Sequence, residues 1–496
     1  MSRFMSSLLL IVGLIAVALI RYIRSLEGHF TDVMATAYRS YEGSLTSTMI
    51  SLLGTDVYVF QGQETISRII RHPNLSSPMA LYVFGQRFMF GMPKRGVSAY
   101  IADDSGPSAK PLPGSHVAPE RRVDYLLHKA FNQAWAGRSM PMVSRRFMDL
   151  LVSHTDSLGI KEDWTDIGDF YKFFGKPVST AVTEAIFGPS LLQLNPDLIE
   201  NSWSFDKVLP LAVLPSSFIF DVSSLPFEKN TVGADSEMRF TESSIYPDGD
   251  GDPFWGSEII RHLQQELLQH GSRGFIDDEC LAAHDMGLIW GVSGCLTSLS
   301  ARPPGVYANT DHLPRANSNV IAAAMLAAFH VFQDLTLLRR VRDEIESSFP
   351  QPFSMDDVTY KQLWELPLLS SIHAEVLRLY VNVFLMFSSP HEDVDLGRWR
   401  LPKGKTALVS TAIAHRNESI WNTKDGMHPS TPSGPTASFG ALKQGMKAEH
   451  NDMEGDRAYF STQGLDGSWV PFGGGPTMCP GRFIAKTVMM STCALL

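Results

Sequence analysis

Hydrophobic positions form one unbroken run near the start of the chain and shorter, periodic segments after it. The run covers Leu8–Ile20, is apolar on every face, and is followed by Arg21 and Arg24. With residues 4–7 added, it approaches the ~17 residues that cross a thin bilayer, and basic residues after a span stay in the cytosol. No small-residue cleavage site follows it, which favours a signal anchor over a cleaved signal peptide or a buried soluble helix. We predict a membrane anchor over residues 1–26.

Beyond the anchor, short β-branched runs alternate with amphipathic helical pieces, and helical patterns dominate from Pro119 onward. Residues 56–60 predict a strand and residues 64–71 a helix. Residues 335–345 predict an amphipathic helix of mixed charge, and residues 399–410 a β-hairpin. The pattern therefore predicts a mainly α chain with a minor β-sheet, and the length allows either one large core or two to three domains.

One apolar helical pattern is interrupted in the middle. Residues 280–291 predict the first half of a long buried helix, and residues 316–330 predict its second half. Between them, residues 292–315 contain Arg302-Pro-Pro-Gly305, and proline breaks a helix because it lacks the backbone N–H. We interpret residues 292–315 as an insertion that loops out of one central helix; an ordinary loop between two helices is the alternative.

Composition and charge limit the classes of partner. The chain has 496 residues, 44% of them hydrophobic, and a formal net charge of −10, so a nucleic-acid-binding surface is not expected. Four cysteines occur without a CxxC pair or a His/Cys cluster at zinc spacing. A disulfide framework is therefore not predicted, and the surroundings are expected to be reducing. Small lipophilic molecules are the expected partners.

A glycine-rich loop near the C-terminus carries the strongest candidate chemistry. Phe472, Gly475, Cys479 and Gly481 lie within Ser468–Lys486, and a helical pattern begins at Arg482. Small residues let the backbone approach something flat and large, and a thiolate is an axial ligand of haem iron. A buried structural cysteine beside a turn is the alternative. The loop resembles the haem-binding loop of the cytochrome P450 family, whose pattern matches these four residues.

A second motif lies about a hundred residues before the cysteine. Glu375 and Arg378 are three residues apart, so on a helix they share a face and can pair. Alone this spacing indicates an everyday salt bridge, but ahead of a Cys-Gly loop it resembles the Glu-x-x-Arg motif of cytochromes P450. Its role in the family is structural. Trp421 and the pair His428-Pro429 fall where a third member of this network is expected, although its usual arginine is not found.

The resemblance implies a single large domain over residues 27–496. It also implies a haem-thiolate monooxygenase that inserts one oxygen atom of O2 into a lipophilic molecule of sterol, terpenoid or polyketide type. It implies haem b bound by Cys479, with Phe472 shielding the thiolate and Gly475 and Gly481 allowing close packing. It further implies electrons from NADPH through an NADPH-cytochrome P450 reductase, and a place in the endoplasmic reticulum membrane with the catalytic domain cytosolic. The style of the segment before the loop resembles fungal P450s of secondary metabolism.

The central helix carries the implied distal residue. Aligned from Ala316, the usual acid position is Asn319 and the usual alcohol position is Val320, and neither side chain is an acid. This pattern resembles the branch that contains sterol hydroxylases and prostacyclin synthase, in which Asn319 would position water. Because that branch includes both oxygenases and isomerases, an isomerase or dehydratase that needs no O2 or reductase stays open.

Several positions depart from the family pattern. Thr477 and Ser388 stand where basic residues usually meet the haem propionates; His128, Trp135 and Arg138 lie on a helix where the family often places such partners, without the usual spacing. Core or solvated positions are the alternative for these three. The chain ends at Leu496 soon after the loop, so we expect a truncated C-terminus. An inactive product that does not hold haem is therefore the remaining alternative.

Overall fold

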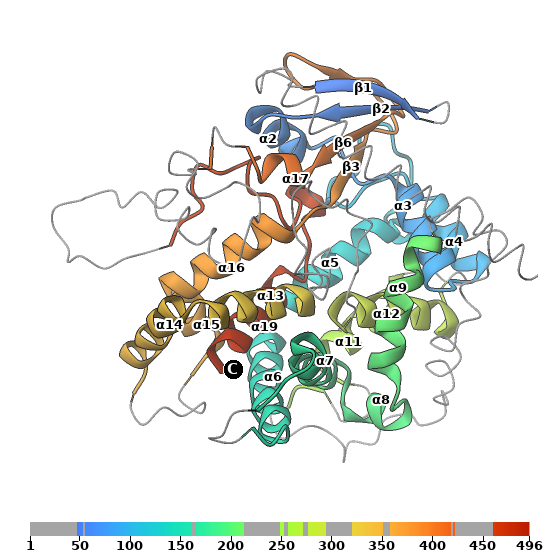
Figure 1. Ribbon diagram of the computed structural model, residues 1–496. Coiled ribbons are helices and arrows are strands. Elements are labelled where there is room, and N and C mark those ends of the chain that lie inside the picture. Colours follow the sequence, from blue (N-terminus) through green and yellow to red (C-terminus); the bar gives the residue numbers. More distant parts are fainter. Residues whose placement is uncertain are drawn as a thin grey trace, which may run out of the picture.

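The computed structural model describes residues 47–52, 55–160, 165–212, 249–251, 256–270, 276–293, 320–350, 358–417, 420–421 and 460–495. Helices form most of the body, and a small sheet caps one side of it (Figure 1). The predicted mainly α fold with a minor sheet is confirmed for these residues. The predicted anchor, residues 1–26, lies outside them. Among the described residues no single helix is long and apolar enough to span a membrane, although one bent pair passes that test by length and composition.

The main sheet has four strands in the order β1-β2-β6-β3. β1 (Ser47–Leu52) runs antiparallel to β2 (Thr55–Phe60), which pairs in parallel with β6 (Thr406–Ser410); β3 (Phe384–Ser388) completes the sheet antiparallel to β6. The parallel pair joins residues almost 350 positions apart, with Val57 opposite Thr406. The sheet therefore ties the N-terminal part of the chain to the segment that precedes the cysteine loop.

Two local predictions near the sheet have different outcomes. The helix predicted over residues 64–71 is α2 (Gln63–Arg71), which buries Ile66, Ile69 and Ile70 against the sheet. The hairpin predicted over residues 399–410 is wrong. β5 (Arg400–Leu401) pairs with β4 (Val394–Asp395), whereas β6 leaves for the main sheet. The reason is that β6 buries four of its five residues between two partner strands, which a two-stranded hairpin cannot provide.

The helical body follows the chain order of its elements. It consists of α3 (Met79–Phe84), η1 (Gly85–Met89), α4 (Lys94–Ile101), η2 (Pro119–Arg121), α5 (Val123–Ala136), α6 (Ser139–Asp156), α7 (Phe170–Phe187), α8 (Pro189–Leu194), α9 (Leu198–Ala212), α11 (Glu258–His270), α12 (Asp278–Ser293), α13 (Val320–Gln333), α14 (Leu335–Ser348), α15 (Tyr360–Glu365), α16 (Pro367–Tyr380), α17 (Thr411–Ala414), η7 (Gly475–Thr477) and α19 (Arg482–Leu495). The predicted helix over residues 335–345 is confirmed as α14.

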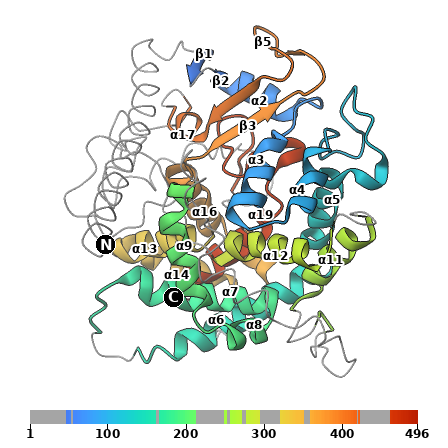
Figure 2. The same cartoon turned by 90° about the vertical axis from the view of Figure 1, so that its right-hand side faces the viewer.

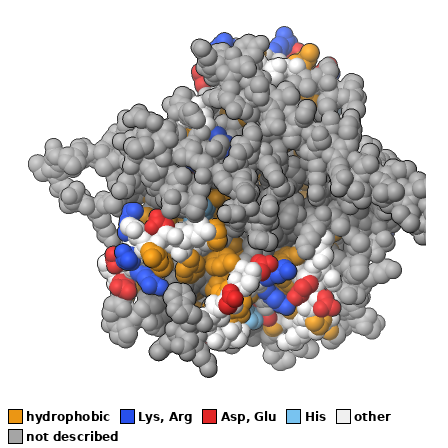
Figure 3. Space-filling model, viewed as in Figure 1, with side chains coloured by type: hydrophobic (Ala, Val, Ile, Leu, Met, Phe, Trp, Pro, Cys, Tyr) orange, Lys and Arg blue, Asp and Glu red, His pale blue; other side chains and the backbone are white. Residues whose placement is uncertain are grey.

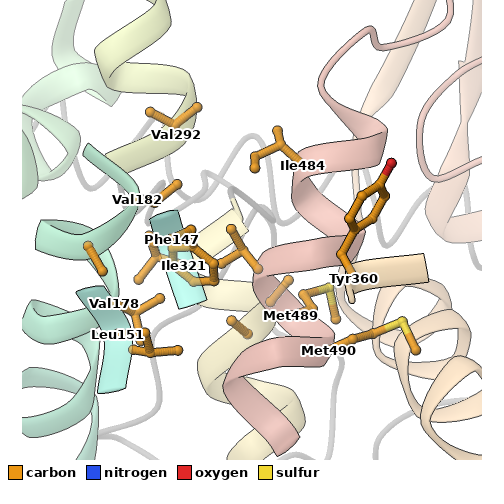
Figure 4. Packing of buried hydrophobic residues seen from close by; sticks show 14 of the residues in the cluster. Phe147, Leu151, Val178, Val182, Val292, Ile321, Tyr360, Ile484, Met489 and Met490 are labelled. Carbon is orange, nitrogen blue, oxygen red and sulfur yellow. The ribbon is translucent and has the colours of Figure 1, made fainter. Parts of the chain in front are cut away.

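The centre of the body is the contact between α13 and α19. Every residue from Ile321 to Ala328 is buried, and five of these eight are alanine. Small side chains let a neighbouring helix approach closely, and α19 supplies longer ones, Met489 and Met490, to fill the remaining space. Figure 4 shows this packing, with Phe147 of α6 and Val182 of α7 closing the cluster. The motif-bearing helix α19 is thereby fixed to the middle of the molecule.

The interrupted central helix is described on both sides of its break. α12 and α13 contact one another and lie at the same level in two perpendicular views (Figures 1 and 2). Val292, predicted to be the first residue of the insertion, is instead buried in the central core as part of α12, so this boundary was wrong. Its apolar side chain continues the buried face of the helix. Residues 294–319, which include Asn319, lie outside the described residues.

The face shown in Figure 3 carries hydrophobic side chains in its lower half, with acidic and basic groups interspersed around them. Separately, partly exposed ion pairs among the described residues include Arg145 with Asp149 on α6 and Lys176 with Glu200 between α7 and α9. In each of these two pairs the opposite charges offset one another locally.

Candidate functional site: the cysteine loop

The loop that carries Cys479 is closed by its own backbone. The Cys479 N–H donates to the carbonyl oxygen of Phe472 at 2.9 Å, and the Gly473 N–H donates to the carbonyl of Val470 at 3.1 Å. Between them, η7 makes a tight turn in which the Met478 N–H bonds the Gly475 carbonyl at 3.2 Å. The predicted residues Phe472 and Cys479 are thus joined by a backbone hydrogen bond. This bond fixes the backbone position from which the Cys479 side chain extends.

The glycines of the loop lie against α2. A Cβ atom on Gly474 would stand 2.1 Å from Cγ2 of Ile70, and one on Gly475 would stand 2.0 Å from the Ile70 carbonyl oxygen. Gly475 also has a φ of +61°, a conformation that residues with a Cβ rarely adopt. The close neighbour of Gly475 in the structure is α2, which the sequence did not indicate. That the loop glycines let haem approach stays a prediction.

Opposing effects act on the pKa of the Cys479 thiol. The side chain is exposed, yet the surrounding protein desolvates the sulfur enough to raise the pKa of the thiol. The backbone N–H groups of Gly481 and Arg482 and the charge of Arg482 act in the other direction and favour the thiolate. These N–H groups lie at the first turn of α19, where the helix dipole also favours an anion. A metal ion at the sulfur would complete this stabilisation.

Aromatic side chains connect the loop to the helix behind it. The His373 ring stacks on Phe472 with centroids 6.4 Å apart and an interplanar angle of 24°. The indole N–H of Trp469 donates to the carbonyl of Ala374 at 3.1 Å. Both contacts join the loop to α16, the helix that carries Glu375 and Arg378. Phe472 packs against the central core from the loop side, and its shielding of the thiolate stays a prediction.

The Glu375–Arg378 pair is completely formed. The Nε and Nη2 atoms of Arg378 donate to the two carboxylate oxygens of Glu375 at 2.7 and 2.6 Å, and both side chains are almost fully buried. A buried pair needs its remaining donors satisfied. Nη1 of Arg378 donates to the His415 carbonyl at 2.9 Å, and the guanidinium lies over the Trp421 ring at 5.1 Å. The motif predicted from spacing is therefore a bidentate, buried ion pair.

Comparison with known proteins agrees with this geometry. A family model for cytochrome P450 matches residues 318–496, the part that holds both motifs. Cytochrome P450 monooxygenase efuG of Hormonema carpetanum is 25% identical over 92% of this chain and 78% of its own length. Cytochrome P450 monooxygenases calL of Penicillium decumbens (24%; 94% and 81%) and fsoE of Humicola fuscoatra (26%; 75% and 64%) are similar too. Residues 318–496 are therefore a cytochrome P450 match, and the similarity over the longer part of the chain is to P450 monooxygenases. The chain is accordingly an oxidoreductase of the monooxygenase kind.

The P450 network contains residues that sequence reasoning missed or left incomplete. Trp421 was expected near the Glu/Arg pair, and the structure places its ring on the Arg378 guanidinium. His415 was not predicted, although its carbonyl accepts from Arg378 and its ring contacts the loop. In the sequence, His415 stands out only because it follows a predicted strand that comes after the Glu-x-x-Arg helix. That position does not indicate which residue His415 would contact. Trp421 therefore contacts the pair through Arg378, whereas His428 and Pro429 lie outside the described residues.

Other expected positions are not brought to the cysteine by the observed contacts. Thr477 uses its hydroxyl on the Gly474 carbonyl at 3.3 Å, and Ser388 pairs through its backbone with Ser76. Trp135 is buried in the core, Arg138 pairs with Glu258 at 3.3 Å, and His128 bonds Asp124 at 3.0 Å. The last three therefore have structural roles here, which was the alternative given for them. Asn319 lies outside the described residues, and Val320 begins α13.

The residues of the loop fit a haem group. The donor set is one thiol held at a helix N-terminus by converging N–H groups, which is the chemistry of a haem-thiolate ligand. Glycines that touch α2 keep the loop thin, and Gly481 stands 3.8 Å from the sulfur at its Cβ position, an ordinary contact distance. Cys479 would hold the iron, with Phe472 and Gly481 beside it. Haem would supply the oxygen-activating chemistry.

Proposed function

We propose that this cytochrome P450 inserts one oxygen atom of O2 into a lipophilic small molecule of secondary metabolism, with haem b bound through Cys479. The observation that carries the proposal is the position of Cys479. Its sulfur meets the N–H groups of Gly481 and Arg482 at the start of a helix that is packed into the centre of the fold. Similarity to three fungal P450 monooxygenases supports the reaction class. A sterol, a terpenoid or a polyketide would each suit an apolar pocket.

The chain's own residues have three tasks in this reaction. The Cys479 N–H bond to Phe472 holds the thiol in place, and the N–H groups of α19 stabilise its negative charge. Phe472, backed by His373, keeps water from one side of the sulfur. The Glu375–Arg378 pair fixes α16 behind the loop. In this proposal Asn319 positions distal water.

We also propose that electrons come from NADPH through an NADPH-cytochrome P450 reductase and that residues 1–26 anchor the protein in the endoplasmic reticulum membrane. The support is the family match and the apolar run Leu8–Ile20. Removing residues 2–26 is expected to release most of the protein from carbonate-washed membranes. Unchanged sedimentation with the membranes would contradict a single N-terminal anchor.

A haem-thiolate isomerase or dehydratase is the second candidate, and α13 gives a specific reason to test it. Within its described residues, Val320–Gln333, the helix contains neither a carboxylic acid nor a hydroxyl side chain. Delivery of protons to bound oxygen usually uses such groups. Product formation that requires NADPH and reductase supports the monooxygenase; turnover without either would establish the isomerase class.

The experiment that tests haem binding is the Cys479→Ala substitution. We expect the variant to lose the absorption band at about 450 nm that a thiolate-ligated haem gives after reduction and CO addition. Cys280→Ser and Cys493→Ser are matched controls, because both cysteines lie outside the loop, and each should keep the band. Retention of a thiolate signature by Cys479→Ala, or its absence from the wild-type protein, would overturn the proposal.

A further inference from the structure

His415 connects two parts of the site through one side chain and one carbonyl. Its side chain is fully buried just after α17. Nε2 of the ring accepts a hydrogen bond from the Val470 N–H at 3.0 Å, and the carbonyl accepts from Nη1 of Arg378 at 2.9 Å. We propose that His415 is a positioning residue that couples the Glu375–Arg378 pair to the cysteine loop and thereby sets the position of Cys479.

The ring must be neutral to play this part. An imidazole accepts at Nε2 only when that nitrogen carries no proton, so the proton resides on Nδ1. Burial and the nearby guanidinium groups of Arg378 and Arg416 lower the pKa of His415 to about 3, although the backbone of Arg378 and Val381 opposes this shift. His415 is therefore a constant hydrogen-bond acceptor at neutral pH, whose Nδ1 completes no hydrogen bond of its own.

The bond to Val470 acts at the base of the cysteine loop. Val470 is buried, and its own carbonyl accepts from the Gly473 N–H at 3.1 Å. Two residues after Val470, the Phe472 carbonyl accepts from the Cys479 N–H at 2.9 Å. A continuous series of backbone bonds therefore leads from His415 to the thiol-bearing residue. Without the imidazole acceptor, the Val470 N–H would be a buried and unpaired donor at the start of this series.

The residue just before Val470 also links the loop to α16. Trp469 donates its indole N–H to the Ala374 carbonyl at 3.1 Å. That bond orients the Trp469 ring, whereas the His415 bond holds the backbone itself. A shift of the Val470 backbone would move Phe472 and Cys479 together, because both follow it in a loop that closes on itself. His415 thus acts on Cys479 through the backbone and makes no contact with the sulfur.

The test compares three substitutions in the full chain and rests on the proposed function that Cys479 binds haem. His415→Leu removes the acceptor at similar volume, and His415→Gln places a carbonyl oxygen near the position of Nε2. His284→Leu is the matched control, since His284 is also a buried histidine but its ring bonds Tyr100 and not the loop. Amide hydrogen exchange of residues 469–481 is measured in the folded fraction, together with the reduced CO spectrum.

We expect His415→Leu to exchange the loop amides about tenfold faster or more, because the buried Val470 N–H is left without its acceptor. Its CO band should shift away from about 450 nm, whereas His415→Gln and His284→Leu keep both wild-type properties. Wild-type exchange in His415→Leu, or equal losses in the Gln or His284 variants, would overturn the inference. A wild-type protein without the band overturns the proposed function alone, because exchange still tests the His415 link.

Discussion

Gly475 lies so close to Ile70 that a Cβ atom added to it would stand 2.0 Å from the Ile70 carbonyl oxygen. The two residues belong to the cysteine loop and to α2, and they are 405 positions apart in the sequence (475 minus 70). Backbone atoms cannot move aside as the end of a flexible side chain can. The loop that presents Cys479 is therefore fitted against the N-terminal part of the chain as well as against α16.

We expect Gly475→Ala to lose most of its haem and to unfold at lower temperature, because the added methyl group meets backbone and the φ of +61° disfavours a Cβ. Gly404→Ala is the matched control: Gly404 has a φ of +69° but no atom within 4 Å of its Cβ position. It should show only the conformational cost of about 1 kcal/mol. Equal losses in both variants would refute the role of the Ile70 contact. Haem content and thermal unfolding are the measurements.

Arg378→Leu is expected to destabilise the protein by about 3–5 kcal/mol, because it leaves the Glu375 carboxylate buried without its partner. The double variant Glu375→Leu/Arg378→Leu should recover part of this loss, since no buried charge is left unpaired. Arg68→Leu is the control, since Arg68 and Glu64 form a largely exposed pair on α2. Urea unfolding measures all three. A double variant as unstable as Arg378→Leu would show that lost packing dominates.

Buried histidines should make the protein sensitive to acid. Burial lowers the pKa of His284 to about 4 and that of His373 and His415 to about 3, so these rings stay neutral when folded. Unfolding lets them bind protons below their ordinary pKa of about 6.5, and stability therefore falls as pH decreases from about 6.5 towards 4. Asp285 acts in the opposite direction, because burial raises its pKa to about 7.

Between pH 4.5 and 6, the chain should take up about two protons net when it unfolds. The three buried histidines bind about three protons, and Asp285 releases about one. Stability then changes by ~2.7 kcal/mol per pH unit, as measured from urea unfolding at several pH values. His373→Leu should reduce this slope by about half, because one of the two net protons is then no longer taken up on unfolding. A slope unaffected by His373→Leu would contradict this assignment.

The interrupted central helix can be tested by deletion. Removing residues 294–315 joins Ser293 to Ala316 and places Ile321 seven residues after Val292 (one step to Ser293, six more through residues 316–321). Residues seven apart share a helix face, and both side chains belong to the central core (Figure 4). We expect equal or higher haem content per protein. Removing residues 293–315 changes the spacing to six and rotates Ile321 away from that face, so haem content should fall. The opposite order would show that the segment is integral to the fold.

The sequence by itself determined the elements whose signals are local. The spacing of Glu375 and Arg378 predicted their pairing, because three residues make nearly one helical turn, and the Gly-rich surroundings of Cys479 predicted a thin loop before a helix. The periodicity of residues 64–71 and 335–345 likewise predicted α2 and α14. These features depend on neighbours along the chain, which a sequence shows directly.

Only the tertiary structure decided which distant segments meet. The sequence around Ile70 does not indicate its contact with the Gly475 backbone, and the sequence around His415 does not indicate its bond to the Val470 N–H. The reason is that both contacts involve backbone groups, which are nearly the same in every residue. The same reason explains the wrong hairpin, in which β6 left β5 to pair with β2 and β3. Trp421 was placed near the Glu/Arg pair by pattern, but its contact with the Arg378 guanidinium arose from packing. Non-local burial and backbone pairing select these partners, and both are properties of the folded chain.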